Sequence, residues 1–230
     1  VTLLTLWDEH TLLCCSRWQG LLLLDLKTGK YNPPPFDCGK EIMNIFIDSQ
    51  KRIWVAPYNG GLNCLTRDGK LLATYTTRNS SLSNNVVLSL AEREGQIWIG
   101  TDGGGINILD PETGQFSLLE HIPGRDNYSL PANSILCLYN DRNNNMWAGS
   151  IRNGLISIRE VSMKTYKDVL PGNDRGLSNS TVLSLFQESE NRIWIGTDGG
   201  GINSFNPFTE KFAHYPSTWE DKVASICPFT

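Results

Sequence analysis

Short apolar segments alternate with turn-forming residues along the whole chain. The segments interleave apolar residues with small polar ones, as in residues 87–90 (VLSL), 135–138 (ILCL) and 182–185 (VLSL). Gly, Asn, Asp and Pro lie between them, for example at Glu94-Gly95 and in residues 111–114 (PETG). Brief alternating runs separated by turns predict β-strands, and no stretch shows the period of an amphipathic helix. The pattern therefore predicts an all-β protein.

One segment occurs in five copies along the chain. Residues 97–107 and 193–203 are both IWIGTDGGGIN, and weaker copies are IWVAPYNGGLN (53–63), MWAGSIRNGLI (146–156) and LLCCSRWQGLL (12–22). Neighbouring copies start 41 to 49 residues apart, and each is flanked by segments that complete four short strands. This period and strand count are typical of β-propeller blades. We expect blades at 1–37, 38–78, 79–125, 126–173 and 174–215, with residues 216–230 opening a sixth.

The number of blades in the intact domain is a separate question. An open propeller leaves sheet edges unprotected. We therefore expect the chain to be part of a larger, seven-bladed propeller, with a self-closed ring of five blades as the alternative.

Two positions of each copy are expected to be structural. A large apolar residue on the second strand should fill the space between neighbouring sheets and bury roughly 150–250 Å². These anchors are Leu13, Trp54, Trp98, Trp147 and Trp194. The glycine seven residues later should allow a positive φ or a close backbone approach. These glycines are Gly20, Gly61, Gly105, Gly154 and Gly201.

Composition excludes several functions. The net charge is −4 with no Lys/Arg cluster, so a nucleic-acid surface is not expected. No apolar run approaches the roughly 20 residues of a membrane helix. The six cysteines include no C-x-x-C pair and are expected to be free, buried small hydrophobes. Pairing in an exported protein is the alternative.

No motif points to a cofactor, a metal or a catalytic group. The Asp-Gly-rich stretches at 102–105 and 198–201 lack the phosphate-loop pattern, and Asp141–Asn145 lacks the later ligands of a calcium loop, so both are expected to be turns. The three histidines lack ligand spacing. Asp102 and Asp198 resemble an acid pair for glycoside cleavage, but they lie two blades apart, beyond the roughly 5–9.5 Å that such pairs need. The segment is therefore not expected to be an enzyme.

The repeat resembles the two-component regulator propeller repeat, whose pattern is approximately N-x-V-x-x-(I/L)-x-x-D-x-x-G-x-(L/I)-W-I-G-T-x-x-G-G-(L/I)-N. Residues 81–87 with 97–101 fit it closely, as do 129–135 and 176–182 with the Trp segments that follow them. The resemblance implies the periplasmic sensor part of a Bacteroides-type hybrid histidine kinase. It also implies oligosaccharide ligands, further blades and a β-sandwich domain of the same receptor, and a homodimer in the full-length form.

Ligand-contacting residues are expected at positions where the blades differ from one another, because the demands of the scaffold are common to all blades. In a propeller, the loops between the second and third strands share one face with the connections between blades. An aromatic ring beside Arg and Asn donors in these loops would suit a glycan. The candidates are Arg17, Trp18, Tyr58, Asn59, Asp102, Arg152, Asn153 and Asp198. The alternative for these residues is that they are simply exposed loop residues. The alternatives for the protein are a protein-interaction scaffold without a small ligand, or a propeller hydrolase or lyase.

Overall fold

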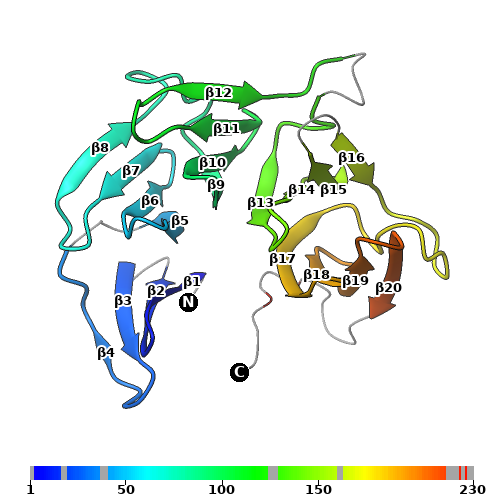
Figure 1. Ribbon diagram of the computed structural model, residues 1–230, viewed down its shortest axis with the longest axis horizontal. Coiled ribbons are helices and arrows are strands. Elements are labelled where there is room, and N and C mark those ends of the chain that lie inside the picture. Colours follow the sequence, from blue (N-terminus) through cyan, green and yellow to red (C-terminus); the bar gives the residue numbers. More distant parts are fainter. Residues whose placement is uncertain are drawn as a thin grey trace. The chain divides into compact units, whose positions relative to one another are not determined.

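The computed structural model describes residues 3–16, 20–36, 41–123, 129–159 and 163–215, together with Val223 and Ile226. The described residues form twenty β-strands and no helix. The strands assemble into five four-stranded sheets in which spatial order follows chain order, which is the construction of propeller blades (Figure 1). The predicted all-β propeller fold is therefore confirmed.

The five sheets have the following strands. The first holds β1 (Leu3–Asp8), β2 (Thr11–Ser16), β3 (Gly20–Asp25) and β4 (Tyr31–Asn32). The second holds β5 (Ile42–Ile47), β6 (Ile53–Pro57), β7 (Leu62–Leu65) and β8 (Leu71–Tyr75). The third holds β9 (Val87–Arg93), β10 (Gln96–Thr101), β11 (Ile106–Leu109) and β12 (Phe116–Leu119). The fourth holds β13 (Ile135–Asn140), β14 (Met146–Ser150), β15 (Gly154–Ile158) and β16 (Met163–Tyr166). The fifth holds β17 (Val182–Ser189), β18 (Arg192–Thr197), β19 (Ile202–Asn206) and β20 (Lys211–Tyr215). The expected opening strand of a sixth blade falls almost entirely outside the described residues and stays a prediction.

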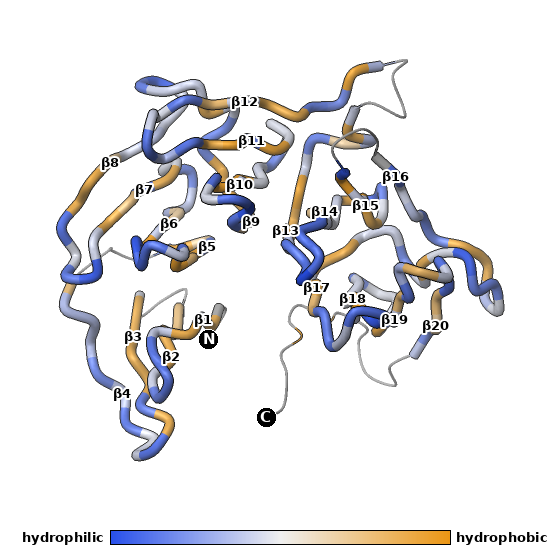
Figure 2. Tube along the Cα trace, viewed as in Figure 1, coloured by the Kyte–Doolittle hydropathy of each residue, from blue (hydrophilic) through white to orange (hydrophobic). Residues whose placement is uncertain are grey.

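The chain divides into two compact units. Unit 1 contains residues 1–99 and 109–116, and unit 2 contains residues 100–108 and 117–230. Apolar residues concentrate in the strands of both units, and hydrophilic residues concentrate in the turns (Figure 2). The core of each unit is described separately below.

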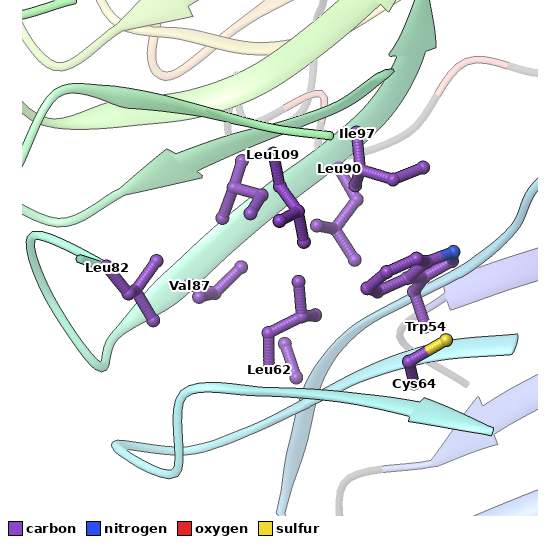
Figure 3. Close-up of a cluster of buried hydrophobic side chains, with 10 residues drawn as sticks. Trp54, Leu62, Cys64, Leu82, Val87, Leu90, Ile97 and Leu109 are labelled. Carbon is purple, nitrogen blue, oxygen red and sulfur yellow. The ribbon is translucent and has the colours of Figure 1, made fainter. Parts of the chain in front are cut away.

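In unit 1, the two faces of the second sheet pack against different neighbours. Ile53 and Val55 join Leu13 of the first sheet in one buried cluster. Trp54, which points to the opposite face, joins Val87 of the third sheet in another (Figure 3). Successive residues of a strand point to opposite faces, so three consecutive apolar residues of β6 serve two interfaces. Leu13 and Trp54, at two of the expected anchor positions, are both 0% exposed.

In unit 2, Trp147 fills the equivalent position between the fourth and fifth sheets. Its ring lies edge-on to Phe205, with 5.6 Å between the ring centroids, in a cluster that includes Tyr166 and Val182. Trp194 is only half-buried, and its ring packs against Tyr215 of its own sheet. Trp147 thus packs between two sheets, at the position expected for an anchor. Most of the residues expected to cover Trp194 lie outside the described part. Trp98, on the third sheet, is buried.

The hairpin turns use the expected residues. Glu94 and Gly95 between β9 and β10 both have positive φ, 54° and 78°, which is the type I′ geometry of two-residue hairpins. The stretch at 141–145 is a hairpin turn, as predicted, because the Asp141 carboxylate accepts bonds from the backbone of Asn143 and Asn145 at 2.9 and 2.8 Å. Both turns join the first and second strands of a sheet.

The four cysteines of the described part, Cys14, Cys15, Cys64 and Cys137, form no disulfide with one another. Cys14, Cys15 and Cys64 are buried. Burial raises the pKa of the Cys64 thiol to about 11. The remaining two cysteines, Cys38 and Cys227, lie outside the described residues.

Candidate functional site

The turn between the second and third strands has the same backbone design in four blades. The glycines at its end, Gly61, Gly105, Gly154 and Gly201, have φ between 70° and 77°, so the predicted positive φ is confirmed. A Cβ on Gly61 would lie 2.2 Å from the carbonyl oxygen of Tyr75, and one on Gly154 would lie 1.9 Å from that of Tyr166. The glycine is therefore required both by backbone conformation and by contact with the fourth strand.

Three of these turns are hydrogen-bonded to the connection that leads into the next blade. In unit 1, the N–H of Gly61 donates to the carbonyl of Asn85 at 3.0 Å. In unit 2, the N–H of Gly105 donates to Asn133 at 2.8 Å and that of Gly154 donates to Ser180 at 2.7 Å. The expectation that these turns share a face with the inter-blade connections therefore holds within each unit.

Four predicted site residues lie along one continuous series of contacts in unit 2. The Ser134 hydroxyl donates to the Asp102 carboxylate at 2.8 Å, and the Ser134 carbonyl accepts from the N–H of Ile151 at 3.1 Å. This links the turn of Asp102 to the turn of Arg152 and Asn153. We call the turns of residues 102–105, 151–154 and 198–201, with connecting residues 133–134 and 180–181, the loop rim.

The loop rim continues into the fifth blade. Beyond Gly154 and Ser180, the N–H of Asp198 donates to the carbonyl of Thr181 at 3.0 Å. Asp102 is exposed and Asp198 is half-buried. Asp102, Arg152, Asn153 and Asp198 thus lie on adjoining loops of unit 2.

Arg152 has an unusual backbone conformation. Its φ is 63°, in the left-handed region, and the residues at the same turn position in the third and fifth blades are Gly103 and Gly199, with φ of 86° and 87°. A side chain in this region costs about 1–2 kcal/mol relative to right-handed backbone. Among the described residues, nothing forms a hydrogen bond or ion pair with the exposed Arg152 guanidinium. Arg152 therefore combines a left-handed backbone with an exposed guanidinium.

The remaining candidates belong to unit 1. Tyr58 is 58% exposed, and its N–H donates to the carbonyl of Glu41 at 2.8 Å. Asn59 has φ of 52°, which asparagine adopts more readily than arginine. Arg17 and Trp18 lie outside the described residues. The ligand-binding role of all eight candidates stays a prediction.

Other residues hold the loop rim in shape, and the sequence analysis did not single them out. The buried hydroxyl of Thr101 donates to the carbonyl of Gly105 at 2.9 Å, and Thr197 and Ser150 make the same bond in their own turns. The buried Asn203 side chain accepts from the N–H of Ser178 at 2.9 Å and fixes the connection into the fifth blade. Recurrence of Thr and Asn at fixed places in IWIGTDGGGIN was the available signal.

Within the described ranges, no group of three or more His, Cys, Asp or Glu side chains is placed to hold a metal ion. In the same part of the chain, no helix is long and apolar enough to cross a bilayer.

The fold and the repeating turns define the chain as a β-propeller repeat protein. Residues 81–103, 129–152 and 176–199 match the two-component regulator propeller repeat, which confirms the resemblance found in the sequence. No curated protein sequence matches the chain.

Several solved structures share the fold. One is the extracellular domain of a Bacteroides thetaiotaomicron protein assigned to the hybrid two-component systems, with a TM-score of 0.64 and 19% identity over 94% of this chain and 34% of that one. Another, of unknown function from the same organism, has a TM-score of 0.60 and 12% identity over 92% of this chain and 56% of that one. The computationally designed protein Ika8 has a TM-score of 0.58 and 16% identity over 97% of this chain and 62% of that one. This chain spans about a third of the length of the first structure.

Proposed function

We propose that this chain is a non-catalytic, ligand-binding segment in the extracytoplasmic region of a hybrid two-component sensor, and that it binds an oligosaccharide at the loop rim. The matched repeats and the fold shared with an extracellular two-component domain support the sensory context. Residues of the loop rim support the ligand site.

The conformation of Arg152 carries the proposal. Residues with strained backbone cluster at ligand-binding sites, which makes Arg152 a candidate ligand contact. Glycine occupies the same position in two other blades, so the turn itself does not require arginine. An exposed guanidinium without an internal partner presents a fork of N–H donors to a ligand.

The neighbouring groups suit a hydroxyl-rich ligand. The Asn153 amide lies beside Arg152, and the carboxylates of Asp102 and Asp198 lie on the adjoining turns. Amide, guanidinium and carboxylate groups supply both the donors and the acceptors that sugar hydroxyls use. Tyr58 belongs to unit 1 and is a separate candidate, whose exposed ring offers a surface on which a sugar can stack.

The test is a glycan-array screen followed by calorimetry on the best ligand, with Arg152→Gly as the decisive variant. Because glycine adopts this φ without strain, the variant should keep the turn and gain roughly 0.5–1 kcal/mol of stability. We expect affinity for the oligosaccharide to fall at least tenfold.

Lys51→Gly is the matched control. Lys51 is exposed and has φ of 65°, but it lies in the turn between β5 and β6, at the opposite end of its sheet from the strand 2–3 turn. The Lys51→Gly variant should gain a similar amount of stability and bind the oligosaccharide with the affinity of the wild type. Unchanged affinity in Arg152→Gly would refute the site, and the absence of any glycan binding would refute the ligand class.

A further inference from the structure

A cleft of about 520 Å³ lies in unit 2, between β16 and the turn that joins β19 to β20. These strands are labelled in Figure 1. Its volume is in the range of small-molecule sites. Its lining is mostly charged and polar, so it suits a hydrophilic ligand rather than an apolar one. The lining residues are Lys164, Thr165, Tyr166, Lys167, Asp168, Val169, Arg175, Thr209, Glu210 and Lys211.

The acidic groups of the cleft already have partners within the protein. Glu210 accepts a hydrogen bond from Lys164, and this bond is the main reason why the pKa of the Glu210 carboxyl is lowered. A hydrogen bond from Tyr166 lowers this pKa further. Asp174, at the edge of the cleft, forms an ion pair with Lys211 at 2.9 Å. Asp168 is hydrogen-bonded to Ser180. These pairs leave little negative charge free to attract a cation.

Two basic groups remain without such partners. Among the described residues, no group forms a hydrogen bond or ion pair with the Lys167 ammonium or the Arg175 guanidinium. The Arg175 backbone N–H donates to the Asn173 side chain at 3.0 Å, and its guanidinium has only the through-space attraction of the neighbouring Asp174. The lining contains four basic and two acidic residues, although the whole chain has a net charge of −4. The cleft lining therefore carries a net positive charge, whereas the protein as a whole carries a net negative charge.

The segment that carries both cations is held in place. Within the connection from β16 to β17, the N–H of Val169 donates to Leu177 at 3.0 Å and that of Leu177 donates to Lys167 at 2.9 Å. The N–H of Phe212 in β20 donates to the Asp174 carbonyl at 2.7 Å. These bonds fix the backbone on both sides of the cleft, so a ligand would not have to order it.

We propose that this cleft binds the oxyanion of a hydrophilic ligand about the size of a monosaccharide, with Lys167 and Arg175 contacting a carboxylate or sulfate group. Arginine offers a planar fork that matches such groups, and lysine adds a compact charge. The cleft adjoins the loop rim, since Ser180 bonds both Asp168 and the N–H of Gly154. The proposal does not depend on oligosaccharide binding at the rim.

The experiment is an NMR titration of the ¹⁵N-labelled protein with sodium sulfate, glucuronate and glucose at constant ionic strength. We expect sulfate or glucuronate to shift the amide signals of residues 164–177 and 209–211, while neutral glucose leaves them in place. A response to glucuronate alone would identify a carboxylate ligand, and a response to sulfate alone would identify a sulfate group.

Variants locate the site. The double variant Lys167→Ala/Arg175→Ala should weaken anion binding at least tenfold without unfolding, because both side chains are exposed. The double variant Lys30→Ala/Lys70→Ala removes the same total charge from exposed turns of unit 1 and should bind like wild type. Equal loss in both variants, no loss in the first, or equal shifts with glucose would overturn the proposal.

Discussion

At the scale of single residues, an acid six positions before the anchor tryptophan holds its indole. Asp48 accepts from the Trp54 Nε1–H at 2.9 Å, and Asp141 accepts from the Trp147 Nε1–H at 2.8 Å. Both acids are buried, and both also close the preceding hairpin turn. One side chain thus satisfies a buried donor and shapes a turn, so its loss leaves several buried groups unpaired.

We predict that Asp141→Ala lowers the free energy of unfolding by about 2–3 kcal/mol, because the buried Trp147 indole and the turn N–H groups lose their acceptor. Glu188→Ala is the matched control. Glu188 accepts from Trp194 at 3.1 Å, but both side chains are partly exposed and water can replace it, so the loss should be below about 1 kcal/mol. Urea denaturation measures both. Equal losses would contradict the role of burial.

The third blade departs from this rule. Glu92 has the same spacing from Trp98, but its carboxylate accepts from the backbone and hydroxyl of Ser49 in the second blade, at 2.7 and 2.5 Å. The Trp98 indole N–H is left without a hydrogen-bond partner among the described residues. Equal spacing in the sequence therefore did not determine the contact, because a neighbouring blade offered Glu92 a competing donor.

At the scale of elements, the glycine that ends the strand 2–3 turn meets two separate demands. Its φ is positive, and the fourth strand's carbonyl oxygen occupies the place of a side chain. Gly114, in the turn between β11 and β12, meets only the first demand, because its φ is 71° and a Cβ there would meet nothing within 4 Å. The two glycines separate conformational strain from steric conflict.

We predict that Gly114→Ala costs about 1 kcal/mol of stability, from the left-handed backbone alone. Gly61→Ala should cost about 3 kcal/mol or more, since the new methyl group would lie 2.2 Å from the Tyr75 oxygen and force the turn away from β8. Chemical denaturation gives both values, and amide exchange at residues 72–76 should increase only in Gly61→Ala. Similar costs would show that φ alone selects the glycine.

The sequence predicted the elements better than the contacts between them. Strand positions, turn glycines and the anchor positions followed from local periodicity, which a repeat displays several times over. The Lys164–Glu210 pair that borders the cleft joins residues 46 positions apart in different blades. The backbone conformation of Arg152 could not be predicted either, because the sequence shows only that Arg152 and Asn153 depart from the Asp-Gly pattern of the third and fifth blades. Such features depend on how chain segments meet, which spacing alone does not specify.

At the scale of the whole molecule, stability comes from apolar interfaces between neighbouring sheets. Cys64 belongs to the interface between the second and third sheets, and Tyr166 to that between the fourth and fifth. Burial raises the pKa of the Cys64 thiol to about 11 from 9.0. Burial, reinforced by Glu210, raises the pKa of Tyr166 to about 12 from 10.0. Each group is therefore harder to ionise in the folded state than in the unfolded state.

These shifts predict alkaline destabilisation. Below pH 9 the thiol is neutral in both states and contributes no pH dependence. As pH rises above 9, the unfolded thiol ionises first, so the free energy of unfolding falls, and the fall from this group ends near pH 11. Cys64→Ala should remove about 1–2 kcal/mol of that fall, and Tyr166→Phe should flatten the curve between pH 10 and 12. Urea midpoints measured from pH 7 to 12 test this, and variant curves that stay parallel to wild type would show that neither buried group drives the transition.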